Sequence, residues 1–132
     1  MPVRSLHSSI KKWPGRTEVF EAFRAWADNQ MKRRSDIGRI GCFGSLVNGT
    51  WGVGSDVDII IILEDSDLSP LRRAAEWDTT QLPVPADVVV LTRHEFEQTP
   101  SRRFRSVFEK DVIWMNNETS AVANKFNSIE KV

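Results

Sequence analysis

The sequence predicts a single domain of the α/β (α+β) class, in which a small mixed sheet is flanked by helices. Three observations lead to this fold class. Apolar runs of strand length occupy residues 37–43, 57–63 and 87–91. Helix signals stand before these runs and between the second and third of them. A chain of 132 residues is long enough for one compact domain and too short for two substantial ones.

The N-terminal part predicts an arm followed by a long helix. Residues 1–15 are polar and basic and are interrupted by Pro14-Gly15, so we expect a flexible arm. Thr17 is expected to cap a helix whose apolar residues recur at i, i+3, i+4 and i+7. The predicted domain covers residues 16–116, and a polar tail, 117–132, completes the chain.

The first two strands are predicted from their apolar composition. Residues 37–43 (IGRIGCF) form the first, and a short helical turn over 45–48 follows and stops at Gly49. Residues 57–63 (VDIIIIL) form the second strand. Because its apolar run is unbroken after the aspartate, we expect this strand to be buried on both faces of the sheet.

The connection to the third strand is predicted to be helical. Ser69 before Pro70 is a favourable N-cap and first-turn pair for a helix that extends to about Trp77. Residues 87–91 (DVVVL) then form the third strand. Trp26 and Trp77 lie on apolar helix faces and are expected in the core, whereas Trp51 is expected to be a partly buried loop anchor.

The C-terminal part predicts two helices and an edge strand. Thr92 and Glu95 form the capping-box pattern of a helix near 93–98. A second helix is expected over 100–109, and residues 112–115 (VIWM) are expected to add a short edge strand.

Composition narrows the function classes. Lysine plus arginine and aspartate plus glutamate number 18 each, so net charge does not indicate a nucleic acid or an anionic membrane as partner. The single cysteine, Cys42, excludes an internal disulfide framework and suits a reducing compartment. No apolar run is long enough for a membrane span or a signal peptide. We therefore expect a soluble cytoplasmic protein.

The predicted strand directions bring three aspartates to one edge of the sheet. Asp56 and Asp58 open the second strand, and the short connection before them predicts antiparallel pairing with the first strand, which ends at Gly44 and Ser45. The helical connection that follows predicts parallel pairing with the third strand, which Asp87 opens. Since side chains alternate along a strand, Asp56 and Asp58 share a face, about 7 Å apart along the backbone.

Three carboxylates at one edge repel one another unless a cation lies between them. Oxygen ligands without histidine or cysteine suit Mg²⁺ or Mn²⁺ better than zinc. A site with two such ions could stabilise the attacking and the leaving oxygen of a phosphoryl-type displacement. Backbone N–H groups after Gly44 and Ser45 begin a helical turn and could hold a phosphate at the same edge. These features together predict nucleotide chemistry.

The same residues carry a resemblance to a known family. Gly44-Ser45, ten intervening residues and then Asp56-Val57-Asp58 form the pattern G-S-x10-D-x-D, with Asp87 as a third acid. Over residues 20–115 the chain resembles the minimal nucleotidyltransferases of the DNA polymerase beta-like superfamily. The resemblance implies that fold, and transfer of a nucleoside monophosphate from a nucleoside triphosphate, with ATP the expected donor, to a hydroxyl group with release of pyrophosphate.

The resemblance also implies roles for individual residues. Asp56 and Asp58 would bind two metal ions, Mg²⁺ or Mn²⁺. Asp87 would join the ion that activates the acceptor hydroxyl and could take its proton. Gly44 and Ser45 would hold the triphosphate, and Ser55 would orient the acid pair.

One position departs from the family pattern. Relatives often carry arginine in G-S-x-A-R-G, where this chain has Asn48 between Val47 and Gly49. The missing cation could be supplied from elsewhere in the chain, and the candidates are Arg39, Arg72, Arg102, Arg103 and Arg105.

Small members of this family resemble one half of two-gene toxin–antitoxin systems. Their partner is an all-helical HEPN protein, and the small enzyme acts as antitoxin by adding AMP to a tyrosine of that ribonuclease. The resemblance thus implies a HEPN-type partner, in a homo- or hetero-oligomer. Two alternatives stay open: a binding module that neutralises its partner by occlusion, and an enzyme that modifies a small molecule.

Overall fold

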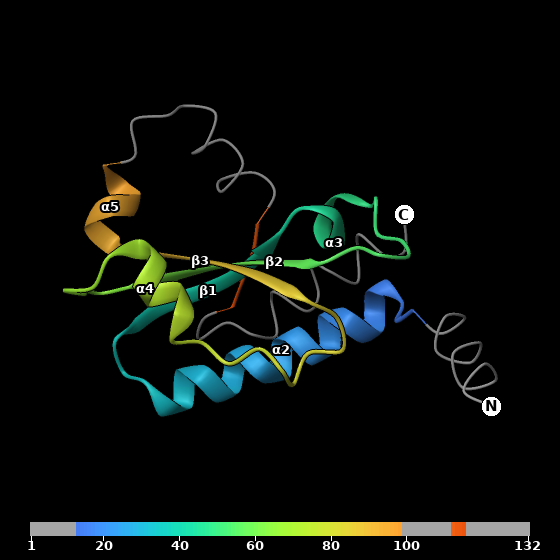
Figure 1. Ribbon diagram of the computed structural model, residues 1–132, viewed down its shortest axis with the longest axis horizontal. Coiled ribbons are helices and arrows are strands. Elements are labelled where there is room, and N and C mark those ends of the chain that lie inside the picture. Colours follow the sequence, from blue (N-terminus) through green and yellow to red (C-terminus); the bar gives the residue numbers. More distant parts are fainter. Residues whose placement is uncertain (1–12, 99–111, 116–132) are drawn as a thin grey trace.

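The computed structural model describes residues 13–98 and 112–115, which form a four-stranded mixed sheet with helices around it (Figure 1). The strands lie in the order β3-β2-β1-β4. This arrangement confirms the predicted fold class. In chain order the elements are α2 (Arg16–Arg33), β1 (Ile37–Phe43), α3 (Ser45–Asn48), β2 (Val57–Leu63), α4 (Pro70–Ala75), β3 (Ala86–Thr92), α5 (Arg93–Glu97) and β4 (Ile113–Met115).

Strand pairing follows the connections between the strands. β1 and β2 are joined by the short segment around α3 and pair antiparallel, while β2 and β3 are joined through α4 and pair parallel. β4 pairs antiparallel with the other side of β1, so it is an edge strand, as predicted. Both predicted strand directions around β2 are therefore confirmed.

Most predicted bounds agree with the structure. β1, α3 and β2 begin and end at the predicted residues, and Gly49 ends α3 in the left-handed conformation, with φ of 92°. Ser69 caps α4, because its side chain accepts a hydrogen bond from the N–H of Arg72. Thr92 and Glu95 form the complete capping box of α5.

Two helix termini were predicted wrongly, and some predictions lie outside the described residues. α2 begins at Arg16, with Gly15 as its N-cap, so Thr17 lies in the first turn and caps nothing. α4 ends at Ala75 instead of Trp77. The predicted helix over 100–109 and the predicted tail lie outside the residues that the structure describes.

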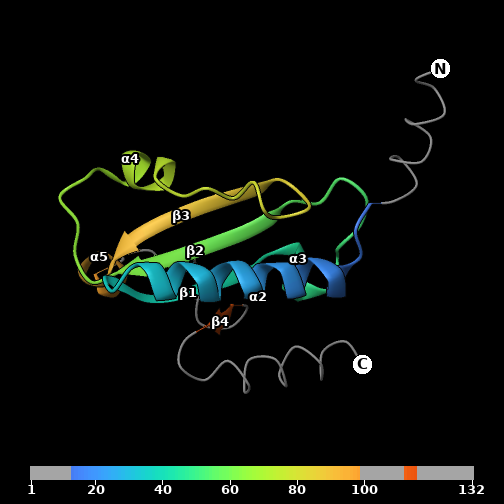
Figure 2. The same ribbon diagram turned by 90° about the horizontal axis from the view of Figure 1, so that it is seen from below.

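The core lies between α2 and one face of the sheet (Figure 2). α2 buries three aromatic side chains there, Phe20, Phe23 and Trp26. Trp77 is buried against Trp26, with ring centres 6.4 Å apart, which confirms both as core residues. The side chain of Trp13 also packs on this core, so the last residues of the predicted arm belong to the folded domain.

A second apolar cluster lies on the opposite face of the sheet. Ile60 and Ile62 of β2 are buried there, whereas Ile59 and Ile61 point into the first cluster, so β2 is buried on both faces as predicted. The guanidinium of Arg39 stacks on this second face, 4.1 Å from the ring centre of Trp114. Within the described residues, no helix is both long and apolar enough to cross a membrane.

A buried arginine connects α4 to α5. Arg73 is only 4% exposed and donates two hydrogen bonds to the carboxylate of Glu95, at 2.6 and 3.0 Å. Its remaining N–H groups reach the carbonyls of Leu68 and Val90. Hydrogen bonds from Arg73 lower the pKa of Glu95 from its usual 4.5 to about 2, with further contributions from the Thr92 backbone and the arginine charge. This ion pair lies beside the carboxyl end of β3.

Candidate active site

The opposite edge of the sheet, where β2 and β3 begin, brings two of the predicted acids together. Asp58 pairs with Asp87 in the parallel β2–β3 ladder and with Phe43 in the antiparallel β1–β2 ladder. Residues directly paired in a ladder point to the same face of the sheet. Asp58 and Asp87 are therefore side-by-side neighbours, and the end of β1 lies beside them.

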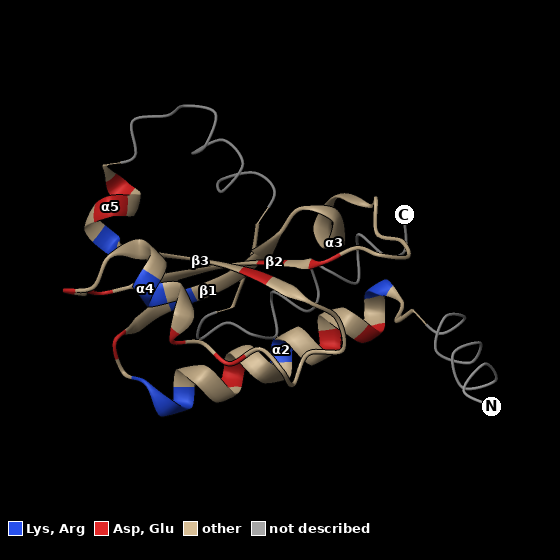
Figure 3. Cartoon of the chain, viewed as in Figure 1, with Lys and Arg blue, Asp and Glu red and all other residues tan. Residues whose placement is uncertain are grey.

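Asp56 stands at the same edge, one residue before β2. The N–H of Val57 donates to the carbonyl of Pro85, which joins the entrance of β2 to that of β3. Figure 3 shows acidic residues near the starts of both strands. Asp56 and Asp87 are exposed, whereas Asp58 is half-buried.

The environment of Asp58 reflects this gathering of charge. Burial raises the pKa of its carboxyl, and the nearby carboxylates of Asp87 and Asp56 raise the pKa further. Asp56 and Asp87 are therefore close enough to Asp58 to act on it electrostatically. Such a field favours a cation at this edge.

Among residues 13–98 and 112–115, no three acidic, histidine or cysteine side chains enclose a metal ion as they stand. Asp58 and Asp87 are nevertheless paired neighbours with hard oxygen donors. Mg²⁺ usually takes one or two protein carboxylates and completes its shell with water and substrate phosphates. The pair of acids therefore fits a divalent ion that a nucleotide helps to bind.

Gly44 allows the chain to turn immediately beside Asp58. Its φ is 75°, a left-handed value that residues with a side chain rarely adopt, and an added Cβ would collide with the Asp58 carboxylate. α3 starts at the next residue. The first hydrogen bonds of this helix are donated by Val47 and Asn48 to the Gly44 carbonyl. The N–H groups that come before Val47 in this turn are therefore not used within the helix.

Ser55 shapes the loop that leads to the acids. Its Oγ accepts a hydrogen bond from the N–H of Gly52 at 3.0 Å, and its own N–H donates to the Gly52 carbonyl at 3.0 Å. The side chain thereby closes a tight turn directly before Asp56. Trp51 is a half-buried anchor of the same loop, as predicted, with its indole N–H donating to the carbonyl of Pro14.

Asn48 stands where the family often has arginine, and neither of the two candidate arginines that the structure describes, Arg39 and Arg72, takes the place of that cation. Arg39 pairs with Ile62, four residues before the end of β1, or about 13 Å away along the strand. Arg72 lies in α4, after the far end of β2, and is exposed. Arg102, Arg103 and Arg105 lie outside the described residues.

Among the described residues, Arg16 donates hydrogen bonds to α3, a contact that the sequence pattern did not indicate. Its side chain donates to the carbonyls of Leu46 and Val47, at 2.8 and 3.0 Å. These partners are 30 and 31 residues away in sequence. No local motif marks such a contact, and only the charge of Arg16 at an unfavourable helix terminus could have drawn attention to it.

The fold and the site together define a class of protein. A mixed sheet in which neighbouring strands begin with aspartates, beside a Gly-Ser turn, is the arrangement expected of a nucleotidyltransferase. A family model described as "Nucleotidyltransferase domain" matches residues 25–114. The chain therefore belongs to the nucleotidyltransferase domain family, and the predicted class of enzyme is confirmed.

Solved structures agree with this fold. A candidate nucleotidyltransferase from Sulfolobus solfataricus superposes with a TM-score of 0.55 and 16% identity, over 75% of this chain and 80% of that one. A mutant of the toxin–antitoxin pair MntA-HpeT aligns at a TM-score of 0.44 and 14% identity, over 89% of this chain and 88% of that one. The second likeness is too low to carry an argument. Among curated proteins, none matches this chain.

Proposed function

We propose that this nucleotidyltransferase transfers AMP from ATP to a hydroxyl group of a partner protein and releases pyrophosphate. The observation that carries the proposal is the pairing of Asp58 with Asp87 beside the tight turn at Gly44. Membership of the nucleotidyltransferase family supports the reaction type.

Asp56, Asp58 and Asp87 are the proposed ligands of Mg²⁺ or Mn²⁺. The donor set fits these ions, because it consists of carboxylate oxygens that repel one another when no cation is present. Two bound ions would supply charge neutralisation at the triphosphate and at the acceptor oxygen.

The remaining roles belong to the chain's own residues. The N–H groups at the start of α3, after Gly44 and Ser45, hold the triphosphate at the sheet edge. Asp87, on the exposed side of the pair, accepts the proton of the acceptor hydroxyl. The acceptor oxygen forms a bond to the α-phosphorus, the bond from that phosphorus to the bridging oxygen breaks, and pyrophosphate leaves. Ser55 supports Asp56 by closing the preceding turn.

The partner is proposed to be a HEPN-type toxin, for which this chain acts as antitoxin. This part rests on the resemblance of the Gly44-Ser45 and Asp56-Val57-Asp58 pattern to minimal nucleotidyltransferases. We also propose a cytoplasmic location, where ATP is available and a buried thiol such as Cys42 stays reduced.

The test uses ATP labelled at the α-phosphate, Mg²⁺ and the partner protein. Wild type should transfer label to the partner, and an Asp56→Asn, Asp58→Asn double variant should transfer none. Asp65→Asn with Asp67→Asn is a matched control, because it removes two charges at the same spacing beyond the far end of β2. Equal labelling by wild type and the site variant would overturn the proposal.

Occlusion is a second candidate function, favoured by one observation. Asn48 stands where the family often has arginine, and its side chain instead accepts hydrogen bonds from Thr50. If the chain acts by occlusion, the Asp56→Asn, Asp58→Asn variant should neutralise the partner as well as wild type does, without labelling it. Loss of neutralisation together with loss of label supports the enzymatic function.

A further inference from the structure

α3 is too short to hold its position by itself. It has four residues, and a single turn of helix is not stable in isolation. The carbonyl groups at its C-terminal end have no partner within the helix. The buried side chains of Leu46 and Val47 fix one face of the turn, but its polar end requires contacts from elsewhere in the fold.

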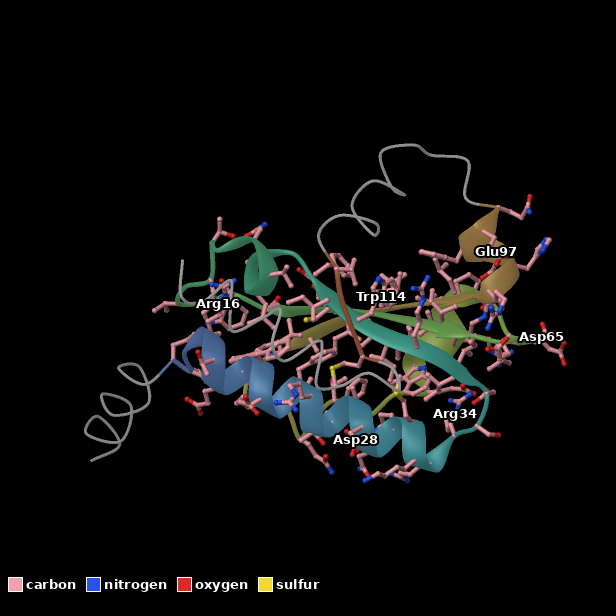
Figure 4. All side chains as sticks on the ribbon, turned by 180° about the vertical axis from the view of Figure 1, so that it is seen from behind. Arg16, Asp28, Arg34, Asp65, Glu97 and Trp114 are labelled. Carbon is pink, nitrogen blue, oxygen red and sulfur yellow. The ribbon has the colours of Figure 1, made fainter. Side chains whose placement is uncertain are left out.

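Arg16 supplies those contacts from the first turn of α2. Its Nε donates to the Leu46 carbonyl at 2.8 Å, and its Nη2 donates to the Val47 carbonyl at 3.0 Å. Figure 4 shows the labelled Arg16 at the start of α2, on the side where α3 lies. A planar guanidinium can bind two neighbouring carbonyls at once, which a lysine ammonium cannot do with the same geometry.

The charge of Arg16 suits α3 and not its own helix. As the first residue of α2 it places a positive charge at the positive end of that helix dipole, which is unfavourable. At the C-terminal end of α3 the same charge faces the negative end of a helix, which is favourable. The local cost to α2 is therefore offset by the contact with α3.

A second contact joins the same two segments. The indole N–H of Trp51 donates to the carbonyl of Pro14 at 3.0 Å, and the ring packs against the core. The contacts of Arg16 and Pro14 thus lie on the two sides of Gly49, where α3 ends and the loop to the acids begins. Residues 13–16 precede residue 25, where the match to the nucleotidyltransferase family begins.

We propose that Arg16 is a positioning residue for the turn of residues 44–48, which holds the triphosphate in the proposed function. The segment 13–16 holds this turn against the sheet edge that carries Asp58 and Asp87. The proposal rests on the proposed function and extends it to a part of the chain outside the family match. Because α3 begins directly after Gly44, a fixed C-terminal end also fixes the N–H groups of its first turn beside Asp58.

The experiment compares Arg16→Gln with wild type in the labelled-ATP assay. We expect the KM for ATP to rise about tenfold, since two charge-assisted hydrogen bonds that orient the turn are lost. The kcat should change much less. A purely structural role would instead lower the apparent kcat with the fraction of folded protein and leave KM unchanged.

Three further variants and one measurement make the result decisive. Arg16→Lys, which keeps the charge, should give an intermediate KM, and Trp51→Phe, which keeps the packing but loses the donor, should raise KM in the same direction. Arg33→Gln removes an exposed arginine at the other end of α2 and should leave KM at the wild-type value. Hydrogen exchange at residues 45–51 without nucleotide should be faster in Arg16→Gln than in Arg33→Gln.

The outcomes separate the two proposals. A wild-type chain that transfers no label would overturn the proposed function. A wild type that transfers label, combined with an unchanged KM and unchanged exchange in Arg16→Gln, would overturn the role of Arg16 alone. If Arg16→Gln does not fold, the same comparison is made with Arg16→Lys and Trp51→Phe, and unchanged KM in both contradicts the proposal.

Discussion

Asp58 and Asp87 face each other as direct partners in the parallel ladder of β2 and β3. Two carboxylates in this position repel each other, and the half-burial of Asp58 adds a desolvation cost, as its raised pKa reflects. Stability alone would favour an uncharged residue at either position. The pair is therefore best explained by the function of this edge, where a cation and a nucleotide are expected.

Replacement of Asp58 by asparagine should stabilise the protein when no metal ion is present. The change removes the repulsion with Asp87 and keeps the size of the side chain, so we expect a gain of about 1 kcal/mol in the free energy of unfolding at neutral pH. Urea denaturation in EDTA measures it. Added Mg²⁺ with a non-hydrolysable ATP analogue should stabilise wild type and have little effect on Asp58→Asn. A variant less stable than wild type in EDTA would contradict this explanation.

Gly44 and Gly49 allow a comparison of two glycines with positive φ. Gly49, at φ 92° and ψ 5°, lies in the left-handed helical region, where alanine should cost about 1–2 kcal/mol of backbone strain. Gly44, at φ 75° and ψ −144°, lies outside that region, in a conformation that is almost restricted to glycine. An added Cβ meets no atom within 4 Å at Gly49, whereas at Gly44 it collides with Asp58. Gly44→Ala should therefore lose more stability than Gly49→Ala, and should also abolish transfer. Activity retained in Gly44→Ala would show that the close approach to Asp58 is not needed.

The ion pair of Arg73 and Glu95 predicts a loss of stability in acid. Because the pKa of Glu95 lies at about 2 in the folded protein and near 4.5 when unperturbed, its contribution is complete above about pH 4.5. The contribution is lost as the pH falls from there toward 2. The side chain of Glu95 is 37% exposed, so solvent screening reduces its value, and we expect Glu95→Gln to cost about 2 kcal/mol at pH 7.

Glu64 provides the control for this prediction. It makes a similar two-pronged pair with Arg93, at 2.9 and 2.6 Å, but both side chains are about half exposed. Glu64→Gln should therefore cost less stability than Glu95→Gln does. Equal losses in the two variants, measured by urea denaturation at pH 7 and pH 3, would contradict the importance of burial at Arg73.

The sheet and the acidic edge could be predicted because their signals are local. Gly44 ends the apolar run of β1, and the uninterrupted apolar composition of β2 implies burial on both faces. Strand direction then follows from the length and type of each connection, and it predicts that Asp58 and Asp87 lie at the same edge of the sheet. The direct pairing of these two residues is seen only in the structure. The capping box of Thr92 and Glu95 is equally local.

The remaining features depend on contacts between distant residues. Arg16 reaches α3 across 30 residues, and Arg73 reaches Glu95 across 22. Gly15 caps α2 without a side-chain hydrogen bond, so the stronger capping propensity of Thr17 was misleading. Trp77 lies beyond the end of α4 and is buried by its contact with Trp26. In the sequence, the position of this apolar residue looks like a continuation of the helix.

Binding of Mn²⁺ in the presence of a non-hydrolysable ATP analogue is the direct test of a metal site at Asp58 and Asp87. Electron paramagnetic resonance measures the free ion for wild type, for Asp58→Asn and for the Glu64→Gln control. Wild type and Glu64→Gln should bind Mn²⁺ with equal affinity, and Asp58→Asn should bind at least about tenfold more weakly. Equal Mn²⁺ affinity in wild type and Asp58→Asn, or no Mn²⁺ uptake by wild type, would contradict a metal site at Asp58 and Asp87.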